Sequence, residues 1–168
     1  MIRGLLGLCL LLLTGCVQPA FDTETAQNMV VRQISVDTSA ISGVTGRQIA
    51  KSPATIDADL TAALRQSLAP LRPTGSVDVS VQVLKLRLFA PQEEIFIGGT
   101  SHIQALVRVT DVKTGRDVMS PLRLLAASDT MRISGPLGPL LSPPAEKDYA
   151  QTIDGFAHNL ARRILRRP

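Results

Sequence analysis

The sequence predicts an α+β fold, a two-layer sandwich in which a four-stranded, mainly antiparallel sheet carries two helices on one face. Two observations support this prediction. Apolar residues recur with a period of two over residues 77–88 and 103–109, as in half-buried strands, and with helical spacing over residues 53–69 and 145–164. The predicted order of elements is β-α-β-β-β-α, which packs as two layers around one core.

The first strand is expected over Met29 to Val36, where β-branched residues are frequent. Residues 38–52 carry glycine, serine and threonine and are predicted to form a loop. Ser52 and Pro53 then have the residue types of an N-cap and a first helical position. The helix should end near Ala69, before two prolines, and its apolar face should consist of Ile56, Leu60, Leu64 and Leu68.

The next two strands form the middle of the predicted sheet. Valines alternate with polar residues from Val77, and then the phase changes by one residue, which predicts a β-bulge near Val83 and Leu84. Residues 103–109 alternate in the same way. Asp111 and Gly115 have the chemistry of a hairpin turn, because the carboxylate accepts backbone hydrogen bonds and glycine tolerates a positive φ.

The hairpin leads to a fourth strand within residues 116–127, where Pro121 indicates an edge position or an interruption. Residues 128–144 form a proline-rich connection to the last helix. That helix should begin at residues 144–146 and end in arginines, which favour the negative end of the helix dipole. Its apolar face should consist of Tyr149, Ile153, Phe156, Leu160 and Ile164.

The N-terminus has the pattern of a cleaved export signal. The apolar run from Leu5 to Leu13 is about half the length that a membrane-spanning helix needs. It is followed by Leu13, Thr14, Gly15 and Cys16, a sequence that resembles the lipobox of bacterial lipoproteins. The resemblance implies that a diacylglyceryl group is attached to the thiol of Cys16, that the preceding bond is cut and that the new amino terminus is acylated.

This pattern divides the chain into three parts. Residues 1–15 are predicted to be the cleaved signal, residues 16–27 the lipidated cysteine and a flexible tether, and residues 28–168 a single periplasmic α+β domain. Several acyl chains hold a protein on a membrane far more firmly than one chain does. By the same resemblance, Val17 after the cysteine favours the periplasmic face of the outer membrane, with the inner membrane as the alternative.

Composition argues against several classes of function. The formal net charge is only +4, and the five aromatic residues are too few for base stacking, so no nucleic-acid partner is expected. The two histidines have no spacing that suggests a metal site, and no cofactor is expected. Ser101, His102 and Asp111 do not predict a catalytic triad, because adjacent strand residues point to opposite faces. The chain is therefore not expected to be an enzyme.

Two segments are candidate contact surfaces. Arg162, Arg163, Arg166 and Arg167 complement the helix dipole, and they are also candidates for contact with anionic phospholipid or an acidic partner. Leu137, Leu140 and Leu141 lie in the proline-rich connection and form either a lid on the core or an exposed binding surface.

The lipobox, the tether and the strands up to Asp111 to Gly115 resemble small bacterial lipoproteins of uncharacterised families, and also the auxiliary lipoproteins of ABC-type envelope transport. The resemblance implies a non-catalytic accessory module that is anchored to a membrane and binds an envelope protein, with phospholipid as a further candidate ligand. A regulator of cell-wall synthesis, which binds a synthase, is the alternative. An enzyme with an unrecognised site is the alternative from a different class, and it would require a pocket with convergent polar groups.

Overall fold

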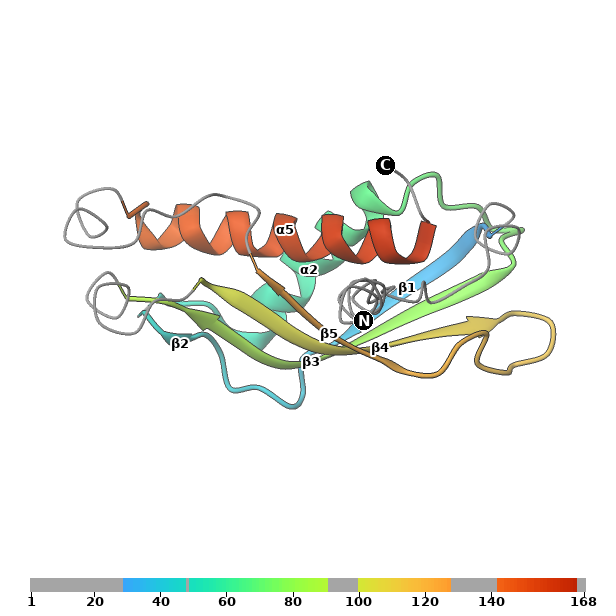
Figure 1. Cartoon of the computed structure of the whole chain (residues 1–168), viewed down its shortest axis with the longest axis horizontal. Coiled ribbons are helices and arrows are strands. Elements are labelled where there is room, and N and C mark those ends of the chain that lie inside the picture. The colour runs from blue at the N-terminus through green and yellow to red at the C-terminus, as the bar shows by residue number, and fades with distance from the viewer. Residues whose placement is uncertain (1–28, 48, 91–99, 128–141, 166–168) are drawn as a thin grey trace, which may run out of the picture.

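The computed structural model describes residues 29–47, 49–90, 100–127 and 142–165. The strands are β1 (Val31–Asp37), β2 (Thr45–Gly46), β3 (Val77–Leu88), β4 (His102–Asp111) and β5 (Leu122–Ala127), and the helices are α2 (Pro53–Ser67) and α5 (Ala145–Leu165). Figure 1 shows both helices on the same side of the sheet. The α+β fold class and the two-layer arrangement are therefore confirmed.

The sheet is mixed and has five strands in place of the four that the sequence predicts. Its order is β1-β3-β4-β5, with β1 parallel to β3 and the other neighbours on this path antiparallel. The additional strand β2 pairs in parallel with the far end of β3, through Thr45 and Gly46. It lies within the predicted loop of residues 38–52. Two residues give no periodic signal, and the pairing depends on β3, which is distant in the sequence.

The predicted bulge is confirmed. The register between β3 and β4 shifts between Val83 and Lys85, at the point where the apolar phase changes in the sequence. Val83 and Leu86 are both fully buried on the helix side of the sheet, so the extra residue returns the apolar set to the core. The strand thereby remains half-buried along its whole length of 12 residues.

The first helix begins as the sequence predicts and ends two residues before the predicted end. The side chain of Ser52 accepts a hydrogen bond from the backbone N–H of Thr55 at 3.2 Å, which caps the helix. The N–H of Leu68 donates to the carbonyl of Leu64 at 2.9 Å, although Leu68 already has C-cap geometry. Leu68 nevertheless packs in the core with the other three predicted residues of its face.

The core lies between the helices and one face of the sheet. All five residues predicted for the apolar face of α5 are buried, and Phe156 is the largest of the fully buried side chains. They pack with the inward-facing valines and leucines of β3 and β4. At the hairpin, Asp111 accepts hydrogen bonds from the backbone N–H groups of Lys113 and Thr114, and Gly115 has φ +66°, as predicted. The other face of the sheet has no helix over it within the described residues.

Candidate functional site

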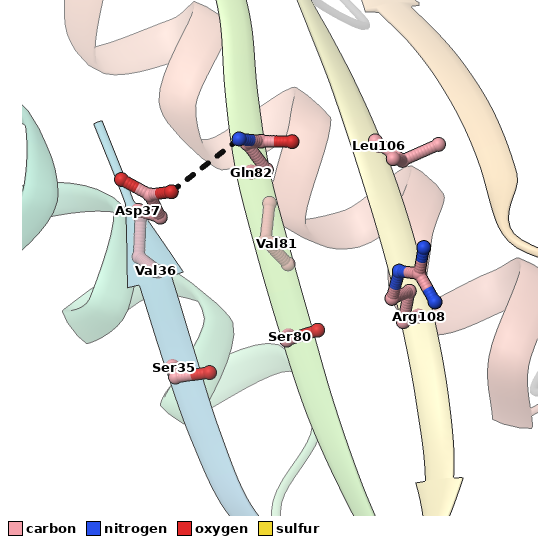
Figure 2. Close-up of a pocket in the computed structure, with 8 residues that line it drawn as sticks. All are labelled: Ser35, Val36, Asp37, Ser80, Val81, Gln82, Leu106 and Arg108. Carbon is pink, nitrogen blue, oxygen red and sulfur yellow. Dashed lines mark hydrogen bonds between the residues drawn. The ribbon is translucent and has the colours of Figure 1, made fainter. Parts of the chain in front are cut away.

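The open face of the sheet, defined as the face opposite α2 and α5, presents mainly polar side chains. The strand register arranges them in rows that cross β1, β3 and β4. One row consists of Ser35, Ser80 and Arg108, and the next consists of Asp37, Gln82 and Leu106. Figure 2 shows these six side chains together on neighbouring strands.

The two rows surround a hollow of about 230 Å³. Ser35 and Ser80 are register partners on β1 and β3, and their short side chains leave space between longer neighbours. Asp37 and Gln82 bound the hollow along the same two strands, while Leu106 and Arg108 are contributed by β4. We call this site the open-face hollow. It lies at the middle of the uncovered sheet face, and polar residues outnumber apolar ones in its lining.

Asp37 supplies an anionic group to the hollow. Its Oδ1 accepts a hydrogen bond from the backbone N–H of Ser39 at 2.8 Å, and its Oδ2 lies 3.5 Å from Nε2 of Gln82. Hydrogen bonding from Ser39 lowers the pKa of Asp37, and the side chain of Ser39 contributes more to this shift than its backbone N–H does. No ion pair to Asp37 occurs among the residues that the structure describes. The hollow therefore holds an exposed carboxylate that is ionised at neutral pH.

Arg108 contributes a guanidinium that already has an anionic partner. Its Nη1 donates to Oδ2 of Asp117 at 3.0 Å, across the hairpin that joins β4 to β5. Thr110 also donates to Asp117, at 3.4 Å. The hairpin thus orients Arg108 beside the hollow. The hollow thus combines a carboxylate, an amide, hydroxyls and one leucine, which suit reversible binding. A general acid or base needs a pKa near the working pH, and the pKa of Asp37 is instead lowered.

Two further polar clusters lie on the helix side of the molecule. The hydroxyl of Ser101 donates to Oδ2 of Asp148 at 2.7 Å and accepts from the N–H of Phe89 at 3.0 Å. Ser101 and Asp148 are both fully buried and connect the end of β3 and the start of β4 with the first turn of α5. The carboxylate partner of Ser101 is thus Asp148 and not Asp111. The ring of His102 is not hydrogen-bonded to this serine hydroxyl, and its Nδ1 lies 3.0 Å from the carbonyl oxygen of Thr100.

The other cluster joins the two helices. The hydroxyl of Tyr149 donates to Oδ2 of Asp59 at 2.8 Å, and Lys51 lies over the tyrosine ring while pairing with Glu146 at 3.2 Å. Burial raises the pKa of Tyr149, and the hydrogen bond to Asp59 raises it further by a smaller amount. The tyrosine ring is almost completely buried, so these contacts position α5 against α2.

The candidate residues from the sequence are only partly within the described ranges. Arg162 and Arg163 are exposed in the last turn of α5, and Arg162 donates to Oδ1 of Asn159 at 2.6 Å. The remaining candidates lie outside the described residues, and they are Leu13, Thr14, Gly15, Cys16, Leu137, Leu140, Leu141, Arg166 and Arg167.

Sequence reasoning missed the open-face hollow. Ser80 and Gln82 are among the polar residues that alternate with valines in the strand predicted from Val77, and Ser35 lies in a strand predicted from its β-branched residues. The hollow depends on the parallel pairing of β1 with β3, which aligns Ser35 with Ser80. Two serines on strands that are distant in the sequence give no local signal for that alignment.

Within the described part of the chain, no three residues of the usual metal-binding types gather into a group that could hold an ion. Neither described helix has the length and apolar character that crossing a bilayer requires.

Comparison with known proteins gives only remote structural similarities. No protein-family model matches the chain, and no curated protein sequence matches it significantly. Protein XCC0632 from Xanthomonas campestris, of family DUF330, is 8% identical with a TM-score of 0.42, and the match covers 88% of this chain and 83% of that one. The PelC dodecamer from Paraburkholderia phytofirmans is 12% identical with a TM-score of 0.36, over 83% of this chain and 90% of that one.

A lipoprotein candidate from Caulobacter crescentus CB15 is 15% identical with a TM-score of 0.34, and the match covers 79% of this chain and 84% of that one. All three TM-scores are below 0.5. These similarities therefore assign neither a family nor an activity to this chain.

Proposed function

We propose that this protein is a lipid-anchored, non-catalytic accessory module of the cell envelope, which binds a partner through the open face of its sheet. The observation that supports the binding role is the open-face hollow. Its polar groups, from Ser35, Asp37, Ser80, Gln82 and Arg108, lie at the centre of a sheet face that the two helices leave uncovered.

The pattern of the N-terminal sequence supports the anchor. The Leu13 to Cys16 lipobox follows an apolar run of export-signal length, and a polar tether of about a dozen residues separates Cys16 from the first described residue, Met29. The lipid would hold the domain close to a membrane. Val17, the residue after the lipidated cysteine, favours the periplasmic face of the outer membrane by the lipoprotein resemblance. Transport of envelope lipids by an ABC-type assembly is the role that the resemblance favours.

The chemistry of the described residues supports binding without catalysis. Asp37 is the carboxylate of the hollow, its pKa is lowered, and the described lining of the hollow contains no histidine. Ser101, a buried serine with a carboxylate partner, has 0% of its surface exposed and is bonded within the core. A substrate would have no access to that hydroxyl.

The exposed arginines at the end of α5 support a second contact, with anionic phospholipid. Arg162 and Arg163 are exposed at the C-terminal end of the helix, in a protein that the anchor would keep near charged head groups. Co-sedimentation of the unlipidated mature chain with anionic vesicles measures this contact. Replacing all four arginines of residues 162–167 by glutamine should reduce binding, and unchanged binding would refute the contact.

The anchor and the binding face require separate experiments. For the anchor, cells that express the wild type or Cys16→Ser are labelled with fatty acid and fractionated. We expect the label and the membrane location in the wild type alone. A Cys16→Ser protein that still incorporates the label would show that the lipobox assignment is wrong.

For the binding face, a photoactivatable residue is placed at Leu125, which is 63% exposed on the open face, and in a control at Ala62 on the exposed side of α2. We expect a discrete cross-linked product from position 125 only, identified by mass spectrometry. A transport component or a wall synthase in that product would decide between the two envelope roles. Equal products from both positions would contradict binding through the open face.

A further inference from the structure

We propose that the partner on the open face is a second copy of this chain, related to the first by a two-fold axis that runs along the strands between β3 and β4. This inference rests on the proposed binding role of the open face and names the partner. It follows from the placement of charge and of shape on that face.

The charges lie at opposite ends of one row. The register aligns Asp37 with Gln82, Gln82 with Leu106, and Leu106 with Arg123, so the row crosses all four main strands. Asp37 at one end and Arg123 at the other are both exposed. Within the described ranges neither of them forms an ion pair. Among the described residues, the row therefore ends in an anion and a cation that have no ion-pair partner.

A two-fold axis brings these ends together. Neighbouring strands are about 4.8 Å apart, so the ends of the row are separated by roughly 14 Å, and its centre lies between β3 and β4. Rotation about an axis through that centre, in the plane between two packed sheets, places Asp37 of each copy opposite Arg123 of the other. An isologous interface makes every contact twice, so one row gives two ion pairs. Sheets that pack face to face in this way keep their strands roughly aligned.

The shape of the face is complementary under the same rotation. The open-face hollow lies over Ser35 and Ser80 on one side of the axis, whereas the longer side chains of Leu106 and Arg108 lie on β4, on the other side. The rotation puts Arg108 of one copy opposite Ser80 of the second, and Leu106 opposite Gln82. Arg108 of each copy thus faces the space over the short serine side chains of the other copy, so the two contacts are reciprocal.

The interface should be weak in solution and favoured on a membrane. A polar face of four strands falls in the size range of transient contacts rather than of permanent dimers. Anchoring both copies to one membrane raises their effective concentration, which converts a weak contact into an occupied one. The proposed dimer therefore belongs to the anchored protein.

The test uses the full lipidated chain in proteoliposomes. Leu106→Cys places a thiol close to the proposed axis, and Ala62→Cys places one on the exposed side of α2 as a matched control. A bismaleimide with a reach of about 10 Å spans the distance between packed sheets. We expect cross-linked dimer from Leu106→Cys and little from Ala62→Cys. Equal yields would overturn the proposal.

Charge reversal in the Leu106→Cys chain tests the ion pairs. Asp37→Arg and Arg123→Asp should each lower the dimer yield roughly tenfold at limiting protein density, since two attractions become two repulsions. The double variant should recover most of the yield, because the pairs re-form with reversed sign. Asp37→Asn, which keeps an acceptor for Ser39, should lower the yield less. Unchanged yields in the single variants, or no recovery in the double variant, would overturn the proposal.

The same experiment separates this inference from the proposed function. Wild-type protein should not react with maleimide, because the lipid occupies Cys16. A labelled wild type would contradict the anchor, and the dimer would then be judged by the yield of Leu106→Cys above that of Ala62→Cys, since both variants carry the same Cys16. Conversely, a cross-link from position 125 to an envelope protein other than this chain, with no dimer from Leu106→Cys, would overturn the second copy and leave the binding role intact.

Discussion

The two faces of the sheet are built from the same strands but differ in what they contact. On the covered face, Val79, Val81 and Val83 are buried in the core, on the side of the sheet that carries α2 and α5. On the open face, the intervening Ser80 and Gln82 line a hollow. Since alternate residues of a strand point to opposite faces, one segment of β3 supplies both surfaces.

Because of this difference, we expect substitutions on the two faces to affect different properties of the protein. Changes on the covered face should alter the free energy of unfolding, and changes on the open face should alter binding while leaving that free energy nearly unchanged. The following predictions run from the largest expected effect on stability to the smallest.

The largest effect is expected on the covered face. Phe156→Ala removes a fully buried ring from α5 and should lower the free energy of unfolding by about 3–5 kcal/mol. Leu125→Ala, at a position 63% exposed on the open face, should change it by no more than about 0.5 kcal/mol. Urea denaturation measures both. Similar losses from the two variants would contradict the contrast between the faces.

The buried connection between the sheet and α5 should come second. Ser101→Ala removes the hydroxyl that donates to Asp148 and accepts from Phe89, which leaves buried polar groups without this partner. The expected loss is about 1–3 kcal/mol by urea denaturation. Ser42→Ala, at an exposed serine, is the control. Equal unfolding midpoints for these two variants would show that the connection contributes nothing.

The start of the covering helix should have a smaller effect. Ser52→Ala removes the acceptor for the N–H of Thr55 and should lower the free energy of unfolding by about 1 kcal/mol. Ser52→Asp should retain most of the stability, because a carboxylate also caps a helix. Thermal unfolding of the two variants checks this, and an aspartate variant as unstable as the alanine variant would contradict the capping role.

The smallest effect on stability is expected when low pH protonates Asp78 on the open face. The hydrogen bond from Arg32, more than its charge, lowers the pKa of Asp78, whose Oδ1 lies 2.9 Å from Nε of that arginine. A lowered pKa gives stability that is present above the unfolded value near 4 and is lost as the pH falls through the folded value. The unfolding temperature should therefore fall less below pH 4 in Asp78→Asn than in the wild type. Identical pH profiles would refute this contribution.

The sequence predicted the elements whose signals are local. The hydroxyl of Ser52, the phase change at Val83 and the turn at Asp111 to Gly115 each specify their own geometry, and all three are present. β2 was missed because it is stabilised from elsewhere. Its Thr45 donates to the carbonyl of Leu86 at 3.0 Å, a contact between residues 41 positions apart.

The candidate site was less predictable than the fold for the same reason. The hollow requires the register of three strands, two of them parallel, and no periodicity in the sequence specifies which residues become neighbours across strands. The lipobox, by contrast, can be predicted from the sequence, since its four residues are contiguous. It lies outside the described residues, so the assignment of Cys16 remains a prediction of the sequence.

The most direct test of binding through the open face is to fill the hollow and measure cross-linking from position 125 in cells. Ser80→Arg places a long side chain in the open-face hollow, and Ala62→Arg places the same side chain on the exposed side of α2. We predict that both variants unfold within about 0.5 kcal/mol of the wild type and that only Ser80→Arg loses the cross-linked product. A Ser80→Arg protein of wild-type stability that still gives the full yield would contradict the proposed role of the open face.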